Sequence, residues 1–154
     1  MTIEPKAMGT IETGTASIEG ACHCGAVRFS VRLSGGLEAA RRCDCSYCGM
    51  RGAVVVSAAT QDLTVLAGQE MLSTYRFNSL VAEHHFCSRC GIYTHHRRRS
   101  NPTQFGVNVA CLGLSPFAFR EVPVNDGQNH PADPGGLDRV AGMLRYEPSS
   151  NSDF

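Results

Sequence analysis

The sequence predicts one mainly β domain that is held together by metal, and three observations support this prediction. At 154 residues, with 42% hydrophobic and 18% charged residues, the chain has the length and apolar content of one domain with one core. Its apolar segments are short and are separated by Gly, Asn and Ser. Its eight cysteines gather mostly in C-x-C and C-x-x-C clusters. Together these features indicate short antiparallel strands arranged around metal sites.

Two patterns predict the strands. Residues 26–33 alternate apolar and polar side chains, as a half-buried strand does, whereas residues 53–58 form a β-branched run suited to a strand buried on both faces. Turn-forming residues between the segments favour antiparallel pairing. In chain order, the expected strands are 26–33, 53–58, 63–66, 72–77, 82–86, 92–96 and 104–109.

The remaining regions are predicted to be loop or tail. Residues 120–139 are rich in proline and glycine and are expected to form an ordered loop. We therefore predict a flexible N-terminal tail at 1–14, a zinc-binding domain at 15–140 and a flexible C-terminal tail at 141–154.

The charge balance and the N-terminus limit the possible partners. The chain has fourteen Lys and Arg residues and fourteen Asp and Glu residues, so its formal charge is zero. This balance argues against a protein that binds nucleic acid or a membrane surface. The N-terminus lacks the basic start and apolar run of a secretory signal, and no stretch approaches the roughly 18 apolar residues of a membrane span. We therefore expect a cytoplasmic protein, in which clustered thiols are metal ligands or catalytic groups rather than disulfides.

The pattern C-S-x-C-G occurs twice, at residues 45–49 and 87–91. Two thiolates at this spacing can converge on one ion at roughly 2.3 Å, and the glycine allows the chain to turn away with a positive φ. Cys43, Cys45 and Cys48 would repel one another as thiolates if no cation lay between them. Zinc is the predicted metal, because it suits tetrahedral sulfur ligation and the spacing is not that of an iron–sulfur protein.

Spacing alone leaves two ways of pairing the clusters. In the first, a closed site has the ligands Cys22, Cys24, Cys87 and Cys90, and a separate open site has the ligands Cys43, Cys45 and Cys48. In the second, a zinc ribbon joins the pairs Cys45/Cys48 and Cys87/Cys90. A four-cysteine site is structural, whereas three ligands leave a position for water or substrate. Cys111 stands alone in an apolar run and is predicted to be a buried thiol.

Three motifs resemble one known family: GACHCGAVRF at 20–29, C-x-C-x-x-C at 43–48 and F-C-x-x-C-G at 86–91. In this order and spacing they resemble the glutathione-dependent formaldehyde-activating enzyme / centromere protein V family, over about residues 18–130. Residues 91–102 and 106–112 resemble a bacterial subgroup of it. The resemblance implies a β-tent of antiparallel sheets and two zinc ions per chain. It assigns the structural zinc to Cys22, Cys24, Cys87 and Cys90, and the catalytic, more labile zinc to Cys43, Cys45 and Cys48.

The resemblance also implies an activity. It suggests zinc-dependent carbon–sulfur bond chemistry of the lyase type, on a small thiol or a thiol adduct such as S-hydroxymethylglutathione. An open zinc site suits this chemistry because it lowers the pKa of a bound thiol or water. The alternative, which centromere protein V suggests, is a zinc-stabilised protein-interaction module without catalysis. Seven thiolates and two Zn²⁺ ions would change the formal charge from zero to about −3. The sequence leaves the oligomeric state open.

The dense basic run supplies candidates for substrate binding. His95 and His96 lie on a predicted strand, so only one of them can point towards the site, and Arg97 has a fork geometry suited to carboxylates. Asn108 is a further candidate for positioning substrate. Water is the expected fourth ligand of the open site, with Asp44 or the inward histidine as alternatives. Packing or surface roles are expected for the other histidines, which are His23, His84, His85 and His130.

Overall fold

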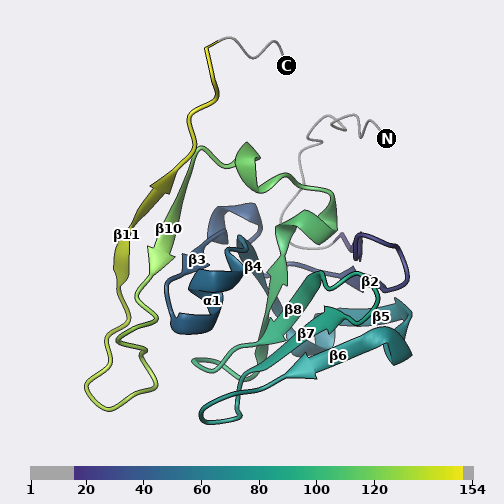
Figure 1. Ribbon diagram of the computed structural model, residues 1–154, viewed down its shortest axis with the longest axis horizontal. Helices are drawn as coiled ribbons and strands as arrows, with labels where there is room; N and C mark the ends of the chain where they lie inside the picture. The colour runs from purple at the N-terminus through teal and green to yellow at the C-terminus, as the bar shows by residue number, and fades with distance from the viewer. Residues whose placement is uncertain (1–15, 151–154) are drawn as a thin grey trace.

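A computed structural model of the chain describes residues 16–150, which form three small β-sheets and one short α-helix (Figure 1). The first sheet has the order β1-β2-β5 and consists of β1 (Ile18–Ala21), β2 (Arg28–Val31) and β5 (Leu63–Ala67). The second has the order β4-β9-β8-β7-β6 and consists of β4 (Val55–Ala59), β6 (Leu72–Tyr75), β7 (Glu83–Cys87), β8 (Tyr93–Arg97) and β9 (Gln104–Asn108).

The third sheet stands to one side of the other two in Figure 1. It has the order β11-β10-β3 and consists of β3 (Arg42–Cys43), β10 (Glu121–Asn125) and β11 (Val140–Arg145). The helix α1 spans Ser46–Arg51. Short 3-10 helices occur at Leu37–Ala39, Thr60–Asp62, Gln69–Met71, Val109–Leu112 and Pro116–Ala118.

The main apolar core lies between the first sheet and strands β4 and β9. Phe29 and Val31 of β2 pack in one cluster with Val56 and Val107, and all four side chains are fully buried. Burial of such a side chain stabilises the fold by roughly 1.5–3 kcal/mol. Strand β4 is buried along most of its length, as the continuous β-branched run predicts. A smaller cluster is centred on Val27 and contacts the first group of cysteines.

The prediction of one mainly β domain is confirmed, and each of the seven expected strands overlaps an observed strand. The expectation of a loop at 120–139 is wrong at its start, because Glu121–Asn125 form β10. Strand β11 continues to Arg145, so regular structure extends past residue 140, where a flexible C-terminal tail was expected to begin. The N-terminal tail predicted at 1–14 lies outside the described residues.

The elements that the sequence did not predict are too exposed or too short to show a pattern of apolar side chains. Every residue of β11 is exposed, so no alternation of apolar and polar side chains marks this strand, which pairs with β10 through its backbone. Strand β3 has two residues, and it pairs with β10 in parallel rather than antiparallel fashion. Helix α1 has six residues, too few to show an apolar period.

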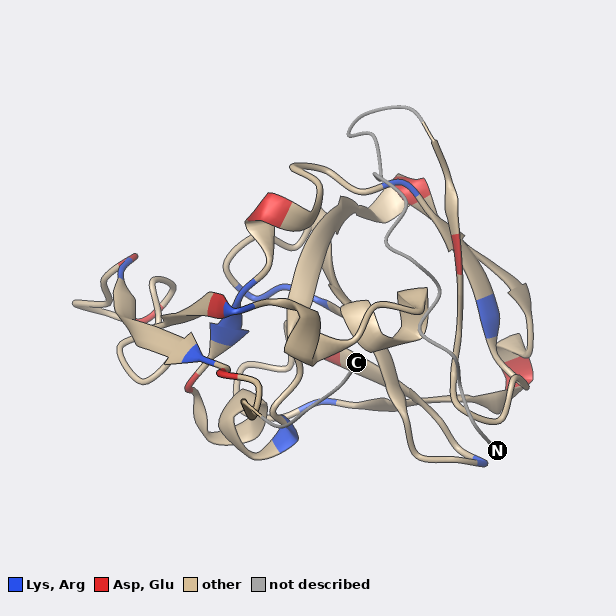
Figure 2. Ribbon diagram, turned by 90° about the horizontal axis from the view of Figure 1, so that it is seen from above, with Lys and Arg blue, Asp and Glu red and all other residues tan. Residues whose placement is uncertain are grey.

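Charged residues of both signs are interspersed along the described chain (Figure 2). This distribution agrees with the zero formal charge of the sequence. None of the helices among residues 16–150 has the length and apolar character that a membrane span requires.

Candidate metal centres and the cavity beside them

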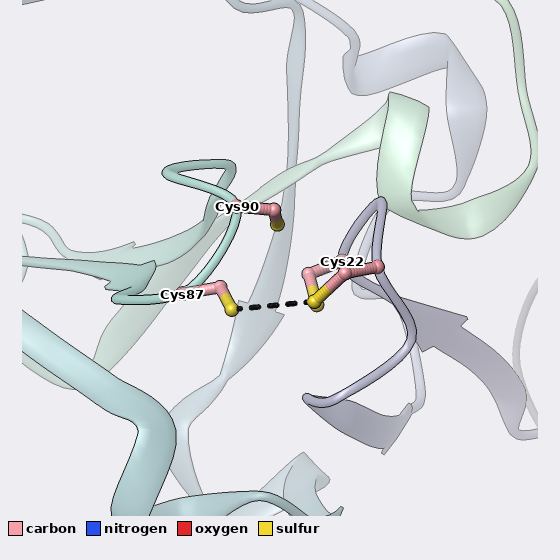
Figure 3. Close-up of side chains that lie close together, drawn as sticks. Cys22, Cys87 and Cys90 are labelled. Atoms are coloured by element: carbon pink, nitrogen blue, oxygen red, sulfur yellow. Dashed lines mark hydrogen bonds between the residues drawn. The ribbon is translucent and has the colours of Figure 1, made fainter.

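The first cysteine cluster joins two hairpins that belong to different sheets. Cys22 and Cys24 lie in the turn between β1 and β2, whereas Cys87 ends β7 and Cys90 lies in the turn before β8. The labelled side chains of Cys22, Cys87 and Cys90 point towards one another in Figure 3. All four Sγ atoms lie within 4.8 Å of one another. The first cluster therefore connects the β1-β2-β5 sheet to the five-stranded sheet.

The spacing of these sulfur atoms fits a zinc ion. The Sγ atoms of Cys22 and Cys24 are 3.6 Å apart, and those of Cys24 and Cys87 are 3.8 Å apart. Four sulfurs bound tetrahedrally at 2.3 Å would be separated by about 3.8 Å. The donor set thus suits zinc in both chemistry and size.

Tight turns bring these cysteines together. Gly25 and Gly91, which follow the last cysteine of each pair, have φ values of 78° and 77°. The predicted role of a glycine after C-x-x-C is therefore confirmed at Gly91. It is wrong at Gly49, which lies inside α1. The cause is that Cys45 caps this helix: its Sγ accepts a hydrogen bond of 3.3 Å from the backbone N–H of Cys48.

The second cluster consists of three cysteines on adjoining elements. Cys43 lies on β3, Cys45 is the N-cap of α1 and Cys48 lies in that helix, and their Sγ atoms are all within 4.8 Å of one another. Two further donors point at these sulfurs. The backbone N–H of Cys45 lies 3.5 Å from Sγ of Cys43, and Arg51 Nη2 donates to Sγ of Cys48 at 3.3 Å. Such donors favour thiolates over thiols.

The three thiols interact strongly with one another. Hydrogen bonds from Cys43 and Cys48 lower the pKa of Cys45 to about 2, whereas the pKa of Cys48 is raised, first by Cys43 and then by Cys45. Without a cation the cluster therefore favours one thiolate beside two thiols, because three adjacent negative charges repel. A divalent cation would let all three ionise, which makes this donor set fit a metal ion.

No side chain of residues 16–150 supplies a fourth ligand to the second cluster. Neither a histidine nitrogen nor a carboxylate oxygen joins the three sulfurs within the 4.8 Å limit. Asp44, a candidate for this role, instead accepts a hydrogen bond of 2.8 Å from the backbone N–H of Gly127. The geometry thus leaves one position of a tetrahedral ion to a ligand from outside the described chain.

The cysteines are grouped four and three, not as the zinc ribbon that their spacing left open. Cys111 belongs to neither group. It is 7% exposed, its Sγ donates to the backbone carbonyl of Tyr93 at 3.4 Å, and burial raises its pKa to about 12. A thiol in this state is unreactive at neutral pH.

A cavity of about 700 Å³ adjoins the second cluster. Cys43, Cys45 and Cys48 form part of its wall. Strands β7 and β8 contribute His84 and His96 to the wall, and the loop between β10 and β11 closes another side. A ligand that binds at the three cysteines would therefore lie in a partly open cavity rather than on a flat surface.

The hydrogen bonds of Tyr93 determine the tautomer of His96. The Tyr93 hydroxyl has one hydrogen, and it donates this hydrogen to the backbone carbonyl of Gly106 at 3.0 Å. Its oxygen also lies 2.6 Å from Nδ1 of His96, so it must accept from Nδ1–H. Nε2 of neutral His96 therefore carries a lone pair.

His84 has the opposite tautomer. Arg51 Nη1 lies 2.9 Å from Nδ1 of His84, and because a guanidinium can only donate, Nδ1 accepts and Nε2 carries the hydrogen. Burial, followed by the charge of Arg51, lowers the pKa of His84 to about 4 and that of His96 well below its usual value. Both rings are thus neutral at pH 7, and they stack with their centroids 5.1 Å apart.

The rings of His84 and His96 both line the cavity, and their Nε2 atoms remain available for a ligand. Neither has a hydrogen-bond partner in the described part of the chain, and neither is sealed from solvent. His84 thus presents an N–H donor and His96 a lone-pair acceptor, side by side on paired strands. This arrangement can hold a hydroxyl group or move a proton.

Of the four candidate substrate residues, only His96 lines the cavity. His95 points the other way, with its ring 4.9 Å from that of Phe105, because alternate residues of β8 face opposite sides. Arg97 lies 3.7 Å from Glu83 on the same side as His95. Asn108 is a structural residue: it donates to the carbonyl of Tyr93 at 2.8 Å and accepts from the backbone of Ala110 at 3.1 Å.

Several cavity residues were not identified from the sequence. His84 was assigned a packing role, yet it lines the cavity and hydrogen bonds to Arg51. His130 also lines the cavity, and its Nδ1 accepts from the backbone of Ala132 at 3.1 Å. Arg51 follows Cys48 by one helical turn, which is the one sequence signal that could have identified it.

Comparisons with known proteins agree with this geometry. A family profile described as "Glutathione-dependent formaldehyde-activating enzyme" matches residues 17–121. A Halomonas elongata protein that is provisionally named a glutathione-dependent formaldehyde-activating enzyme is 41% identical over 81 residues. That match covers 47% of this chain and 51% of the relative, so the chain spans about half the length of this curated relative.

A solved structure is also similar. The crystal structure of a Rhodobacter sphaeroides protein is 53% identical to this chain, with a TM-score of 0.68. The match covers 70% of this chain and 99% of that one.

Proposed function

The chain belongs to the glutathione-dependent formaldehyde-activating enzyme family, and we propose that it reversibly joins a small thiol to an aldehyde carbon. In the forward direction a thiol sulfur attacks the carbonyl carbon and a C–S bond forms. The electron pair of the carbonyl π bond moves to oxygen, and the proton lost by the thiol ends on that oxygen. With formaldehyde and glutathione the product is S-hydroxymethylglutathione. The reverse reaction is a carbon–sulfur lyase step.

The observation that supports this proposal is the open three-cysteine cluster on the wall of the cavity. A zinc ion held by Cys43, Cys45 and Cys48 would lower the pKa of a thiol and so favour the nucleophilic thiolate. Arg51 donates to Cys48, which spreads the negative charge of the cluster. The cavity beside the open cluster favours catalysis over an interaction module, because a module without catalysis needs no space of this size at the cluster.

His84 and His96 are suited to the proton transfers. The lone pair on Nε2 of His96 can accept the thiol proton and pass the same proton to the oxygen that becomes the hydroxyl, while Nε2–H of His84 can donate a hydrogen bond to that oxygen and so stabilise its negative charge. Their low pKa values keep each ring neutral at pH 7, and their hydrogen bonds to Arg51 and Tyr93 favour the required tautomers. In the reverse direction the hydroxyl proton returns through Nε2 of His96 to the departing thiolate.

The test compares zinc-loaded protein with a Cys45→Ser variant on a panel of thiols and aldehydes. We expect the parent to accelerate both formation and breakdown of the adduct, and Cys45→Ser to remain folded and lose this activity. A Cys111→Ala variant is the control, because Cys111 lies outside both clusters. If the zinc-loaded parent changes neither rate with any thiol on the panel, the proposal is wrong.

A further inference from the structure

The outer edge of the third sheet is formed by β11. This strand is the outermost one of its sheet in Figure 1, and among residues 16–150 it pairs with β10 alone. All six of its residues, Val140–Arg145, are exposed. Just after the strand, Tyr146 donates its backbone N–H to the carbonyl of Arg120 at 2.9 Å, on the β10 side. Because backbone groups alternate between the two edges of an antiparallel strand, those of Met143 and Arg145 point away from β10.

This edge has few of the features that prevent strands from pairing. Natural edge strands carry charges, prolines or bulges that keep other strands away. The only charged residue of β11 is Arg145, at its last position, and Nε of Arg145 already forms an ion pair of 2.9 Å with Glu121 of β10. The bulge lies beside Ala141, near the start of the strand, so residues 142–145 continue in regular register. The edge is therefore open to a further strand.

One face beside this edge is apolar. Leu144 lies opposite Val122 of β10, and Tyr146 follows Leu144 by two residues on the same face. The ring of Phe117 lies 5.0 Å from the ring of Tyr146. Leu144, Tyr146 and Phe117 are 44%, 42% and 65% exposed. An exposed apolar surface next to an unpaired strand edge is typical of a site that binds another strand.

We propose that the free edge of β11 binds the same edge of a second copy of this chain, in antiparallel orientation, to form a symmetric dimer. This inference does not depend on the proposed function. Antiparallel pairing of identical strands is self-complementary, so a two-fold axis at Met143 places this residue opposite itself. The same register places Leu144 opposite the partner's Gly142 and Arg145 opposite the partner's Ala141.

Shape and charge both fit a second copy. A Cβ built at Gly142 meets nothing within 4 Å, so there is open space over this residue, and Leu144 of the other copy fills it. Because the pairing is symmetric, this contact forms twice. No two charged side chains oppose each other, since Arg145 lies opposite an alanine and keeps its ion pair with Glu121. The dimer joins the third sheets of the two copies into one continuous sheet and covers both exposed edges.

Sedimentation velocity of the zinc-loaded full chain over the micromolar concentration range tests the dimer. We expect the parent to change from monomer to dimer as its concentration rises. Met143→Lys and Met143→Glu each place two like charges opposite each other at the axis, and each should raise the dissociation constant of the dimer at least tenfold. An equimolar mixture of these two variants places opposite charges at the axis and should form more dimer than either variant alone.

Leu66→Lys is the matched control, because Leu66 is 50% exposed on β5, an outer strand of another sheet, and Met143 is 48% exposed. This variant should dimerise as the parent does. Gly142→Val fills the space that the partner's Leu144 needs, and it should stay folded and weaken the dimer at least tenfold, so it decides the test if the Met143 variants unfold. A parent that stays monomeric overturns the dimer, and so does a dimer that Leu66→Lys disrupts. A mixture with no more dimer than its components overturns the pairing about Met143.

Discussion

A single hydroxyl group decides which nitrogen of His96 can accept a proton. The Tyr93 hydrogen is donated to Gly106, so its oxygen is available only as an acceptor for Nδ1–H of His96. The position of the ring also requires that residue 106 has no side chain, because a Cβ on Gly106 would lie 2.9 Å from Nδ1 of His96. Tautomer and ring position are therefore both set by neighbours on β8 and β9.

A His96→Gln substitution tests this role directly. If Nε2 of His96 accepts the thiol proton, its loss should lower kcat by about 100-fold, the usual contribution of a general base. Steady-state kinetics of adduct formation measures the effect. His85→Gln is the matched control, because His85 lies one position from His84 and its Nδ1 bonds to exposed Thr74 rather than facing the cavity. Equal losses in the two variants would contradict the assignment.

At the scale of elements, the two C-S-x-C-G segments show what the sequence can and cannot predict. The pattern indicates that sulfurs gather, and the structure brings them together in both places. It does not predict the backbone conformation, because residues 45–49 begin a helix and residues 87–91 form a turn. The difference arises from the neighbours: Cys45 follows β3 and caps α1, whereas Cys87 ends a strand that pairs on both sides.

The strands with a buried face could be predicted, and the cavity wall could not. Alternation and β-branched runs locate β2 and β4 because burial selects those side chains. The residues of the cavity wall come from four separate segments, and no local pattern shows that Arg41, Arg98 and His130 meet. Strand alternation predicts that only one histidine of the pair His95–His96 points to the site without saying which one, and in the structure His96 is the one that lines the cavity.

The β10–β11 loop also has a close approach that can be tested. A Cβ built at Gly127 would lie 2.7 Å from the Cβ of Cys45 and still closer to Sγ of Cys43. Gly127→Ala should therefore displace the second cluster and reduce bound zinc from two ions to one per chain, while the fold is kept. Elemental analysis by mass spectrometry measures the zinc content.

Gly142→Ala is the control for this substitution. Gly142 lies on β11, and a Cβ there meets nothing within 4 Å. This variant should keep two zinc ions. Two ions retained by Gly127→Ala would show that the loop does not constrain the cysteines.

At the scale of the whole molecule, the two clusters connect different parts of the fold. The first joins the β1-β2-β5 sheet to the five-stranded sheet, and the second lies where β3 of the third sheet meets α1. Loss of the first should thus separate two sheets, whereas loss of the second should disturb only one wall of the cavity.

A comparison of Cys22→Ser with Cys45→Ser tests this division. Structural zinc contributes folding free energy on the order of the whole stability of a small domain, about 5–15 kcal/mol. Cys22→Ser should therefore unfold the protein. Cys45→Ser should leave the circular dichroism spectrum unchanged and the thermal unfolding cooperative. Unfolding of both variants to the same extent would contradict the separation of roles.

Removal of metal from the intact chain should proceed in two phases for the same reason. The second site has three protein ligands of intermediate exposure on a cavity wall, so a chelator can reach it and remove its ion first. The first site has four protein ligands that join two sheets, and although Cys24 is exposed, Cys22 and Cys87 are buried, so its ion should be released only as the fold opens. Zinc release, followed with a chelating dye, should show a fast phase of one ion without change in circular dichroism. A second, slower phase should coincide with unfolding. A single phase in which both ions leave together with the secondary structure would show that the two sites stabilise the fold equally.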